Sequence, residues 1–128
     1  MSESNRDDDE KDTDVRSSKA FKRLKGNLSN KTVWLYVLSH LQKHGPTYGY
    51  QIKQSLSELY NVDLAMVTGY VILYRLEREK LVMTESSNQG KPQRKYYRIT
   101  PRGESLLQAA KEFIAETYQV IFDEELPK

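Results

Sequence analysis

The apolar positions between Met66 and Arg78 recur at the spacing of an α-helix and divide this segment into two unlike faces. One face is an ordinary core stripe, made of Gly69, Ile72, Leu73 and Leu76. The opposite face and its flanks combine apolar, tyrosine, hydroxyl and arginine side chains, namely Val67, Thr68, Tyr70, Val71, Tyr74, Arg75 and Arg78. Such a surface suits the phosphate-lined groove of a nucleic acid, but tyrosines that are half-buried beneath a neighbouring chain explain this helix equally well.

Two further helices are predicted before this segment. The first covers residues 29–44 and ends at Gly45-Pro46, which stops a helix. The second follows at once, with Thr47 as its N-cap and a buried stripe at Ile52, Leu56 and Leu59. Tyr50 lies in its first turn, where unpaired backbone N–H groups can hold a phosphate, although a tyrosine packed into a helix corner is the alternative. Asp63 is the predicted cap of the helix at residues 66–78.

A hairpin is predicted after the third helix. Residues 81–84 form a short strand, residues 85–93 carry turn residues, and residues 94–100 alternate as a second strand. The order of three helices and a basic hairpin is that of a winged helix-turn-helix, so the fold class is mainly α with a small β-hairpin. In such domains the third helix enters the major groove and the hairpin, or wing, reaches the neighbouring backbone or minor groove. Lys91, Arg94 and Lys95 are the candidates for the wing contact.

The last predicted helix begins at Thr100-Pro101, with Thr as N-cap and Pro at the first helical position. Its apolar stripe is wide for a helix at the end of a small domain, so we expect a second copy to cover it and form a homodimer. The alternative is that the helix folds back on the first helix, with Trp34 as its lid. The expected dimer contacts are Leu107, Ala110, Phe113, Ile114, Tyr118 and Ile121. A two-fold dimer would present two third helices to a pseudo-palindromic site.

Charge is segregated along the chain. Residues 1–19 hold seven acidic and four basic side chains and lack apolar periodicity, which predicts a disordered arm that either aids solubility or competes with DNA for the basic face. Residues 80–102 hold six basic side chains against one acid, beside the tyrosine-bearing helix. The expected organisation is an acidic arm at 1–19, a winged-helix domain at 20–102, and a dimerisation helix with a short tail at 103–128.

Several classes of protein are disfavoured by the sequence. The chain has no cysteine, which excludes disulfides and thiolate zinc sites, and His40 with His44 alone makes a poor metal site, so both are expected on a helix surface. No catalytic constellation or Gly-rich phosphate loop is present, so neither an enzyme nor a cofactor is expected. No apolar run approaches the roughly 20 residues that span a membrane, and the polar start is no secretory signal. These features predict a cytoplasmic protein.

Four fragments, in order over residues 25–110, resemble the PadR family of transcriptional regulators. They are Lys25-Gly26-Asn27-Leu28, Gly45-Pro46-Thr47-Tyr48-Gly49-Tyr50-Gln51-Ile52, Tyr70 with Leu73-Tyr74-Arg75-Leu76-Glu77-Arg78-Glu79-Lys80-Leu81-Val82, and Gln89 to Gly103 with its Arg94-Lys95-Tyr96-Tyr97 strand. The resemblance implies a winged-helix repressor that dimerises through its C-terminal helix, and in some members a small, often aromatic, effector binds near the dimer interface. This chain departs from the family where Gly69 replaces a leucine and Val71 a proline, so we expect a looser fit beneath the third helix.

The sequence therefore predicts a homodimeric regulator that binds double-stranded DNA. The predicted DNA contacts on helices are Tyr50, Thr68, Tyr70, Tyr74 and Arg75, and those on the wing are Lys91, Arg94 and Lys95. The alternative is a winged-helix module that binds a partner protein through its tyrosine face. Salt separates the two, because a contact made by several cations on DNA weakens steeply as salt concentration rises.

Overall fold

The computed structural model describes residues 14–87 and 94–127, with the side chains of Ser87 and Arg94 left out, and the chain divides into two compact units, residues 1–32 and 33–128. The first unit contains α2 (Lys19–Asn27). The Ser18 hydroxyl caps this helix by accepting a hydrogen bond from the Phe21 backbone N–H at 3.2 Å. None of the residues of α2 is buried.

Helix α2 was not predicted, because charged side chains outnumber the apolar ones in this part of the sequence. Residues 14–17 are helical as well. The expectation of disorder up to residue 19 is therefore wrong for residues 14–19, while residues 1–13 of the predicted arm lie outside the described part of the chain.

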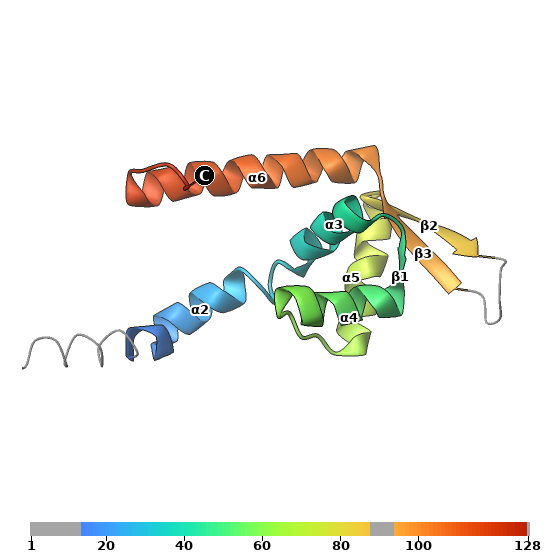
Figure 1. Cartoon of the computed structure of the whole chain (residues 1–128), viewed down its shortest axis with the longest axis horizontal. Coiled ribbons are helices and arrows are strands. Elements are labelled where there is room, and N and C mark those ends of the chain that lie inside the picture. The colour runs from blue at the N-terminus through green and yellow to red at the C-terminus, as the bar shows by residue number, and fades with distance from the viewer. Residues whose placement is uncertain (1–13, 88–93, 128) are drawn as a thin grey trace, which may run out of the picture. The chain divides into compact units, whose positions relative to one another are not determined.

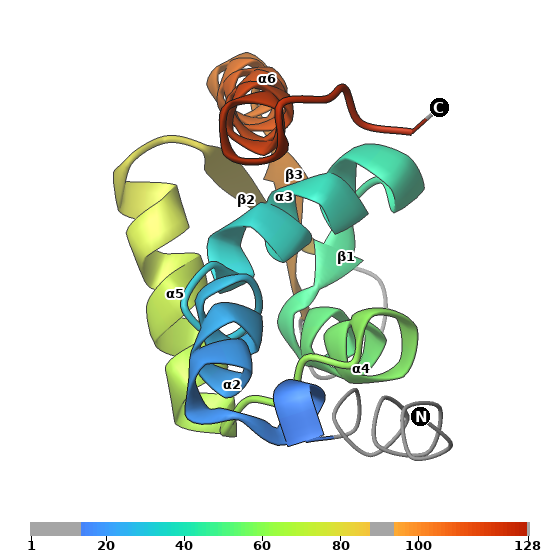
Figure 2. The ribbon, with the colours of Figure 1, turned by 90° about the vertical axis from the view of Figure 1, so that its left-hand side faces the viewer.

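The second unit has the predicted order of a winged helix (Figure 1). Its elements are α3 (Val33–His44), β1 (Thr47–Tyr48), α4 (Gly49–Tyr60), α5 (Met66–Arg78), β2 (Val82–Ser87), β3 (Arg94–Ile99) and α6 (Pro101–Phe122). Figure 2 shows α3 between α6 on one side and α4 with α5 on the other. The predicted fold class is confirmed, and the third predicted helix is α5.

Three predicted helix starts are wrong. Helix α3 begins at Val33 rather than at residue 29. Thr47 does not cap α4 but lies in β1, and the N-cap of α4 is Tyr48. Asp63 does not cap α5, whose N-cap is Ala65; the Asp63 carboxylate instead accepts a hydrogen bond from the Ser57 hydroxyl at 2.6 Å. Neither α4 nor α5 has a hydrogen bond to the side chain of its N-cap residue.

The wing belongs to a three-stranded antiparallel sheet of order β1-β3-β2. In β3, Tyr97 pairs with Thr47 of β1 on one side and with Thr84 of β2 on the other. Strand β1 was not predicted, since two residues are too few to show a period, and β2 runs to Ser87 rather than ending at residue 84. Strand β1 therefore connects β3 of the wing to the turn that precedes α4.

The core is built around α3. The buried apolar side chains are Val33, Val37, Leu38, Leu41, Ile52, Leu56, Val62, Leu73, Leu76, Leu81, Val82 and Tyr97. Leu59 was predicted to be buried but is exposed, and Val62 is buried instead. Asn61 adopts a left-handed conformation at the end of α4, and the Val62 N–H then donates to the Leu56 carbonyl at 3.0 Å, which turns the chain inward.

The start of α6 is as predicted. Thr100 is the N-cap, and its hydroxyl accepts a hydrogen bond from the Gly103 N–H at 3.0 Å and donates one to the Lys80 carbonyl at 2.7 Å. Leu106 and Leu107 pack against the core, and α6 contacts α3. The alternative in which α6 folds back on the first helix therefore holds for its first turns, with Trp34 also partly buried against the core.

His40 is buried, which corrects the prediction that it lies on a helix surface. Its ring lies 4.5 Å from the His44 ring and 6.1 Å from the Tyr60 ring, between centroids. Its Nδ1 atom is buried without a hydrogen-bond partner among the described residues. Burial, followed by the charges of His44 and Lys43, lowers the pKa of His40 below 6.5, because a charged imidazole would lose its hydration there.

The lowered pKa of His40 predicts a loss of stability in mild acid. Below pH 6.5 the unfolded chain binds a proton at His40 more readily than the folded chain does, so the free energy of unfolding falls as the pH drops from 6.5 to the folded-state pKa. Urea unfolding followed by circular dichroism between pH 7.5 and 5.5 measures this slope. The His40→Gln variant should show a flatter pH dependence, and an equal slope in both proteins would contradict the assignment.

Candidate nucleic-acid interface

The face of α5 predicted to contact DNA lies on the surface. Side-chain exposure is 75% for Val67, 47% for Tyr70 and 59% for Tyr74. Thr68 and Arg75 are exposed beside them. On the opposite face Leu73 and Leu76 are buried in the core, so the period read from the sequence orients the helix correctly.

Tyr70 is held in place by α4. A Cβ atom added to Gly49, the first residue of α4, would lie 3.1 Å from Cε1 of the Tyr70 ring, so a larger residue there would displace the ring by a few tenths of an ångström. Tyr50, one residue later, is 48% exposed. Both tyrosines are thus about half buried and half exposed, so each can pack within the protein and still contact a nucleic acid.

An apolar hollow lies between α4 and α5, beneath Gly69. Its walls come from α3, α4 and α5, and Tyr50, Tyr70 and Met66 lie among its lining residues. About 360 Å³ of space lies between these walls, part of it open to solvent. A Cβ on Gly69 would meet no atom within 4 Å. The structure therefore agrees with the looser fit expected from a glycine at this position.

Gly69→Ala should raise the stability of the protein. Alanine in a helix interior is favoured over glycine by roughly 0.5–1 kcal/mol, and the new methyl group has space here. Urea unfolding of the two proteins should therefore give a higher midpoint for Gly69→Ala with the same slope. A lower midpoint would show that the space beneath α5 is needed for its packing.

Tyr74 has a cationic partner that sequence reasoning did not include among the site residues. The guanidinium carbon of Arg78 lies 6.0 Å from the centre of the Tyr74 ring, the spacing of a cation–π contact. Both residues are exposed, and Arg75 is exposed one residue after Tyr74. The separation of four residues could have identified this pair from the sequence, because residues i and i+4 share a helix face.

The structure describes the three predicted wing cations to different extents. Lys91 lies outside the described residues, and of Arg94 only the backbone is described, at the start of β3. The Lys95 side chain is 55% exposed, and its ammonium lies 3.5 Å from Oε1 of Glu77 on α5 and 5.7 Å from the centre of the Tyr97 ring. Sequence reasoning missed Glu77, which lies 18 positions earlier in the chain.

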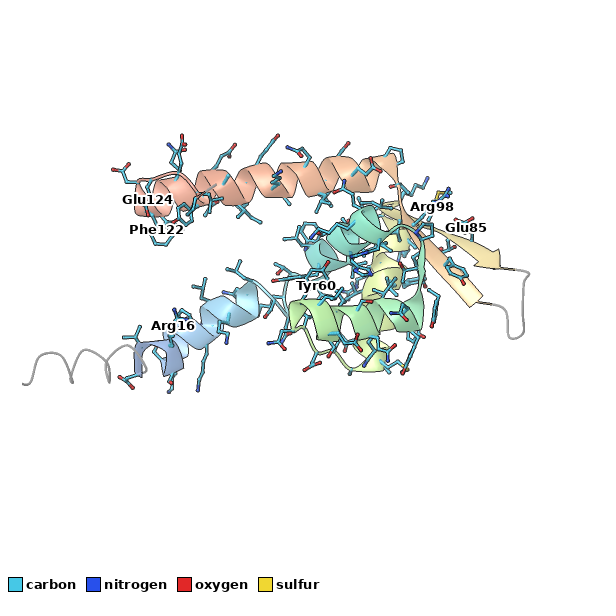
Figure 3. All side chains as sticks on the ribbon, viewed as in Figure 1. Arg16, Tyr60, Glu85, Arg98, Phe122 and Glu124 are labelled. Carbon is cyan, nitrogen blue, oxygen red and sulfur yellow. The ribbon has the colours of Figure 1, made fainter. Side chains whose placement is uncertain are left out.

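A second ion pair crosses the wing. Nε of Arg98 on β3 lies 3.3 Å from Oε1 of Glu85 on β2, and Figure 3 shows the two side chains side by side. Both side chains are about half exposed. Because a surface pair of this kind contributes little to stability, Arg98 remains available to exchange Glu85 for another anion.

The second half of α6 leaves its apolar stripe uncovered. Phe113 is 68% exposed, Ile114 43% and Ile121 64%. Ala110 and Tyr118 are partly buried, and the centre of the Tyr118 ring lies 4.8 Å from the centre of the Phe122 ring near the end of the helix. Of the predicted dimer contacts, Leu107 already packs against the core of its own chain.

Other kinds of site find no support in the part of the chain that the structure describes. Within residues 14–87 and 94–127, no three His, Asp or Glu side chains gather as a metal site would require. Among the same residues, no helix is both long enough and apolar enough to cross a membrane.

Comparison with known proteins agrees with this geometry. Residues 37–109 match the family model described as the transcriptional regulator PadR-like family. The crystal structure of a PadR family regulator from Eggerthella lenta is 31% identical, with 87% of this chain and 88% of that one covered and a TM-score of 0.61. A transcriptional regulator from Clostridium thermocellum is 26% identical, with 80% and 96% covered and a TM-score of 0.64.

A third structure shares the fold at lower identity. The PadR of Bacillus subtilis, in complex with operator DNA, is 24% identical, with 60% of this chain and 44% of that one covered and a TM-score of 0.55. No curated protein sequence matches the chain.

Proposed function

The chain belongs to the PadR-like family of transcriptional regulators, and from this premise we propose that it represses transcription by binding duplex DNA as a homodimer. Helix α5 would enter the major groove and the wing would contact the neighbouring backbone. The exposed face of α5 carries this proposal, because Thr68, Tyr70, Tyr74 and Arg75 present hydroxyl and guanidinium donors together. Such donors bind phosphates and base edges.

The homodimer is proposed from the second half of α6. Phe113, Ile114 and Ile121 continue the stripe that packs on the core at the start of the helix, but all three remain exposed among the described residues. A second copy that packs there would bury the stripe on both chains at once. The two copies of α5 would then face DNA with two-fold symmetry, which suits a pseudo-palindromic operator.

Tyr70 provides the direct test of the α5 assignment. We expect Tyr70→Ala to weaken binding by about tenfold or more, equal to roughly 1.4 kcal/mol, because the ring fills the space between α4 and the groove. The probe is a duplex that the wild-type protein selects from a random-sequence pool, and binding is followed by fluorescence anisotropy. Leu59→Ala is the control, and it should bind as the wild type does. It also removes an exposed side chain, but Leu59 lies at the C-terminal end of α4, whereas Tyr50 lies at the N-terminal end.

Tyr70→Phe separates ring packing from the hydroxyl contact. It keeps the ring against Gly49, so any loss of affinity comes from the hydroxyl group alone. Thermal unfolding of each variant shows whether it is folded at the assay temperature. Full affinity in folded Tyr70→Ala would remove this residue from the interface.

A further inference from the structure

Glu77, near the end of α5, contacts both strands of the wing. Its Oε2 atom accepts a hydrogen bond from the Thr84 hydroxyl on β2 at 2.7 Å, and its Oε1 atom lies 3.5 Å from the Lys95 ammonium on β3. We infer that Glu77 is a positioning residue that fixes the wing relative to α5, and that Lys95 acts through Glu77 rather than through a DNA phosphate. This inference rests on the proposed function, in which α5 and the wing bind one duplex.

The location of Glu77 makes it suited to this role. At the base of the wing, the hydroxyl and the N–H of Thr100 donate hydrogen bonds to the carbonyls of Lys80 and Leu81, which follow α5. Glu77 instead contacts the hairpin beyond its base, at Thr84, two residues after Val82 on β2, and at Lys95, four residues before Ile99 on β3. A single carboxylate therefore contacts both strands, and the hydrogen bond from Thr84 is the stronger restraint, because the ion pair with Lys95 is longer and more exposed.

A small rotation of the wing would matter for DNA binding. From the base at Val82 to Ser87 the strand extends about 16 Å at roughly 3.3 Å per residue, so a rotation of about 10° about the base moves its end by almost 3 Å. A displacement of that size is larger than the spread of donor–acceptor distances at which a hydrogen bond to phosphate forms. Restraint of the wing by Glu77 thus sets the position of β2 and β3 relative to α5 while α5 is seated in the groove.

The Lys95 side chain is 55% exposed, and its ammonium has partners within the protein. Its ammonium lies between the Glu77 carboxylate and the face of the Tyr97 ring, 5.7 Å from the ring centre. Burial and the Glu77 carboxylate raise the pKa of Tyr97, so its hydroxyl stays neutral beneath this pair. The side chain of Glu77 is 32% exposed, so its hydrogen bond to Thr84 is partly shielded from water.

The test compares two acids at the same end of α5. Removing a negative charge near DNA strengthens binding by electrostatics alone, so Glu79→Ala should bind the selected duplex as well as the wild type does, or more tightly. Glu77→Ala removes the same charge but also releases the wing, so we expect binding to weaken about tenfold. Thr84→Val, which changes no charge, should weaken binding in the same direction, and Glu77→Gln, which keeps an acceptor for Thr84, should retain more affinity than Glu77→Ala.

The role of Lys95 is read from the salt dependence. A lysine that contacts phosphate contributes about 0.9 to the slope of log affinity against log salt concentration. We expect Lys95→Met to leave this slope unchanged, and the double variant Glu77→Ala with Lys95→Met to bind no more weakly than Glu77→Ala alone. A slope reduced by about 0.9 in Lys95→Met, or equal affinities of Glu77→Ala and Glu79→Ala, would overturn the inference.

A measurement without DNA separates this inference from the proposed function. In the free protein, amide hydrogens of residues 82–87 and 94–99 should exchange faster in Glu77→Ala and Thr84→Val than in the wild type or Glu79→Ala. If the wild-type protein binds no duplex, the proposed function fails while exchange still reports on the restraint. Unchanged exchange rates in both Glu77→Ala and Thr84→Val would overturn the positioning role even if DNA binding is confirmed.

Discussion

Gly103→Ala should destabilise the protein by about 3 kcal/mol or more, the largest effect that we expect from removing or adding a single methyl group. Gly103 is buried in the first turn of α6, where the helix passes Leu81, the residue before β2. A Cβ atom there would overlap the carbonyl oxygen of Leu81 and would lie 2.7 Å from Cγ1 of Ile99. Because the obstacle is backbone, no side-chain rotation relieves it, and α6 has to move away from the sheet.

Urea unfolding followed by circular dichroism measures this loss. Gly69→Ala is the matched control, since it adds the same methyl group to a helical glycine where nothing lies within 4 Å, and its effect should have the opposite sign. An unfolding midpoint of Gly103→Ala equal to that of the wild type would show that α6 does not pack on the sheet in this way.

Charges placed on the bare half of α6 should convert the dimer to monomers. In Ile114→Glu with Ile121→Glu, two carboxylates from each chain would be buried against each other, so we expect dissociation at micromolar concentration. Binding to the selected duplex should fall by about a hundredfold or more, because the two copies of α5 no longer bind as one unit. Sedimentation velocity measures the mass, and anisotropy measures the affinity.

The control adds the same charge to the other side of the helix. Ala115 and Gln119 are exposed and lie on the face opposite the apolar stripe, so Ala115→Glu with Gln119→Glu should stay dimeric. A wild-type protein that sediments as a monomer, or a charged-stripe variant that remains a dimer, would contradict the assignment of this surface.

Much of the fold follows from local periodicity in the sequence. The buried and exposed faces of α5 were predicted from a repeat within 13 residues, and the capped start of α6 from Thr100 and Pro101. Prediction failed where the pattern is short or is decided elsewhere in the chain. Strand β1 has two residues, and Leu59 and His40 exchange the expected surface and core positions because of how α4 ends and packs on α3.

The candidate site divides along the same line. The exposure of Tyr70 and Tyr74 depends on the face of a single helix, so the sequence was sufficient to predict it. The partner of Lys95 depends on how β3 packs against α5, and neither strand alternation nor charge density reveals that Glu77 takes this ammonium. A charged residue can therefore be assigned to a surface from sequence, but its partner has to be read from the tertiary structure.

The most direct test of the account is a titration of the selected duplex with the wild-type protein at a series of salt concentrations. A homodimer that binds DNA through several cations should bind each duplex with two protomers. The logarithm of its affinity should fall linearly with the logarithm of the salt concentration, with a slope of several units. An affinity that does not change with salt, or no binding at low ionic strength, would contradict it.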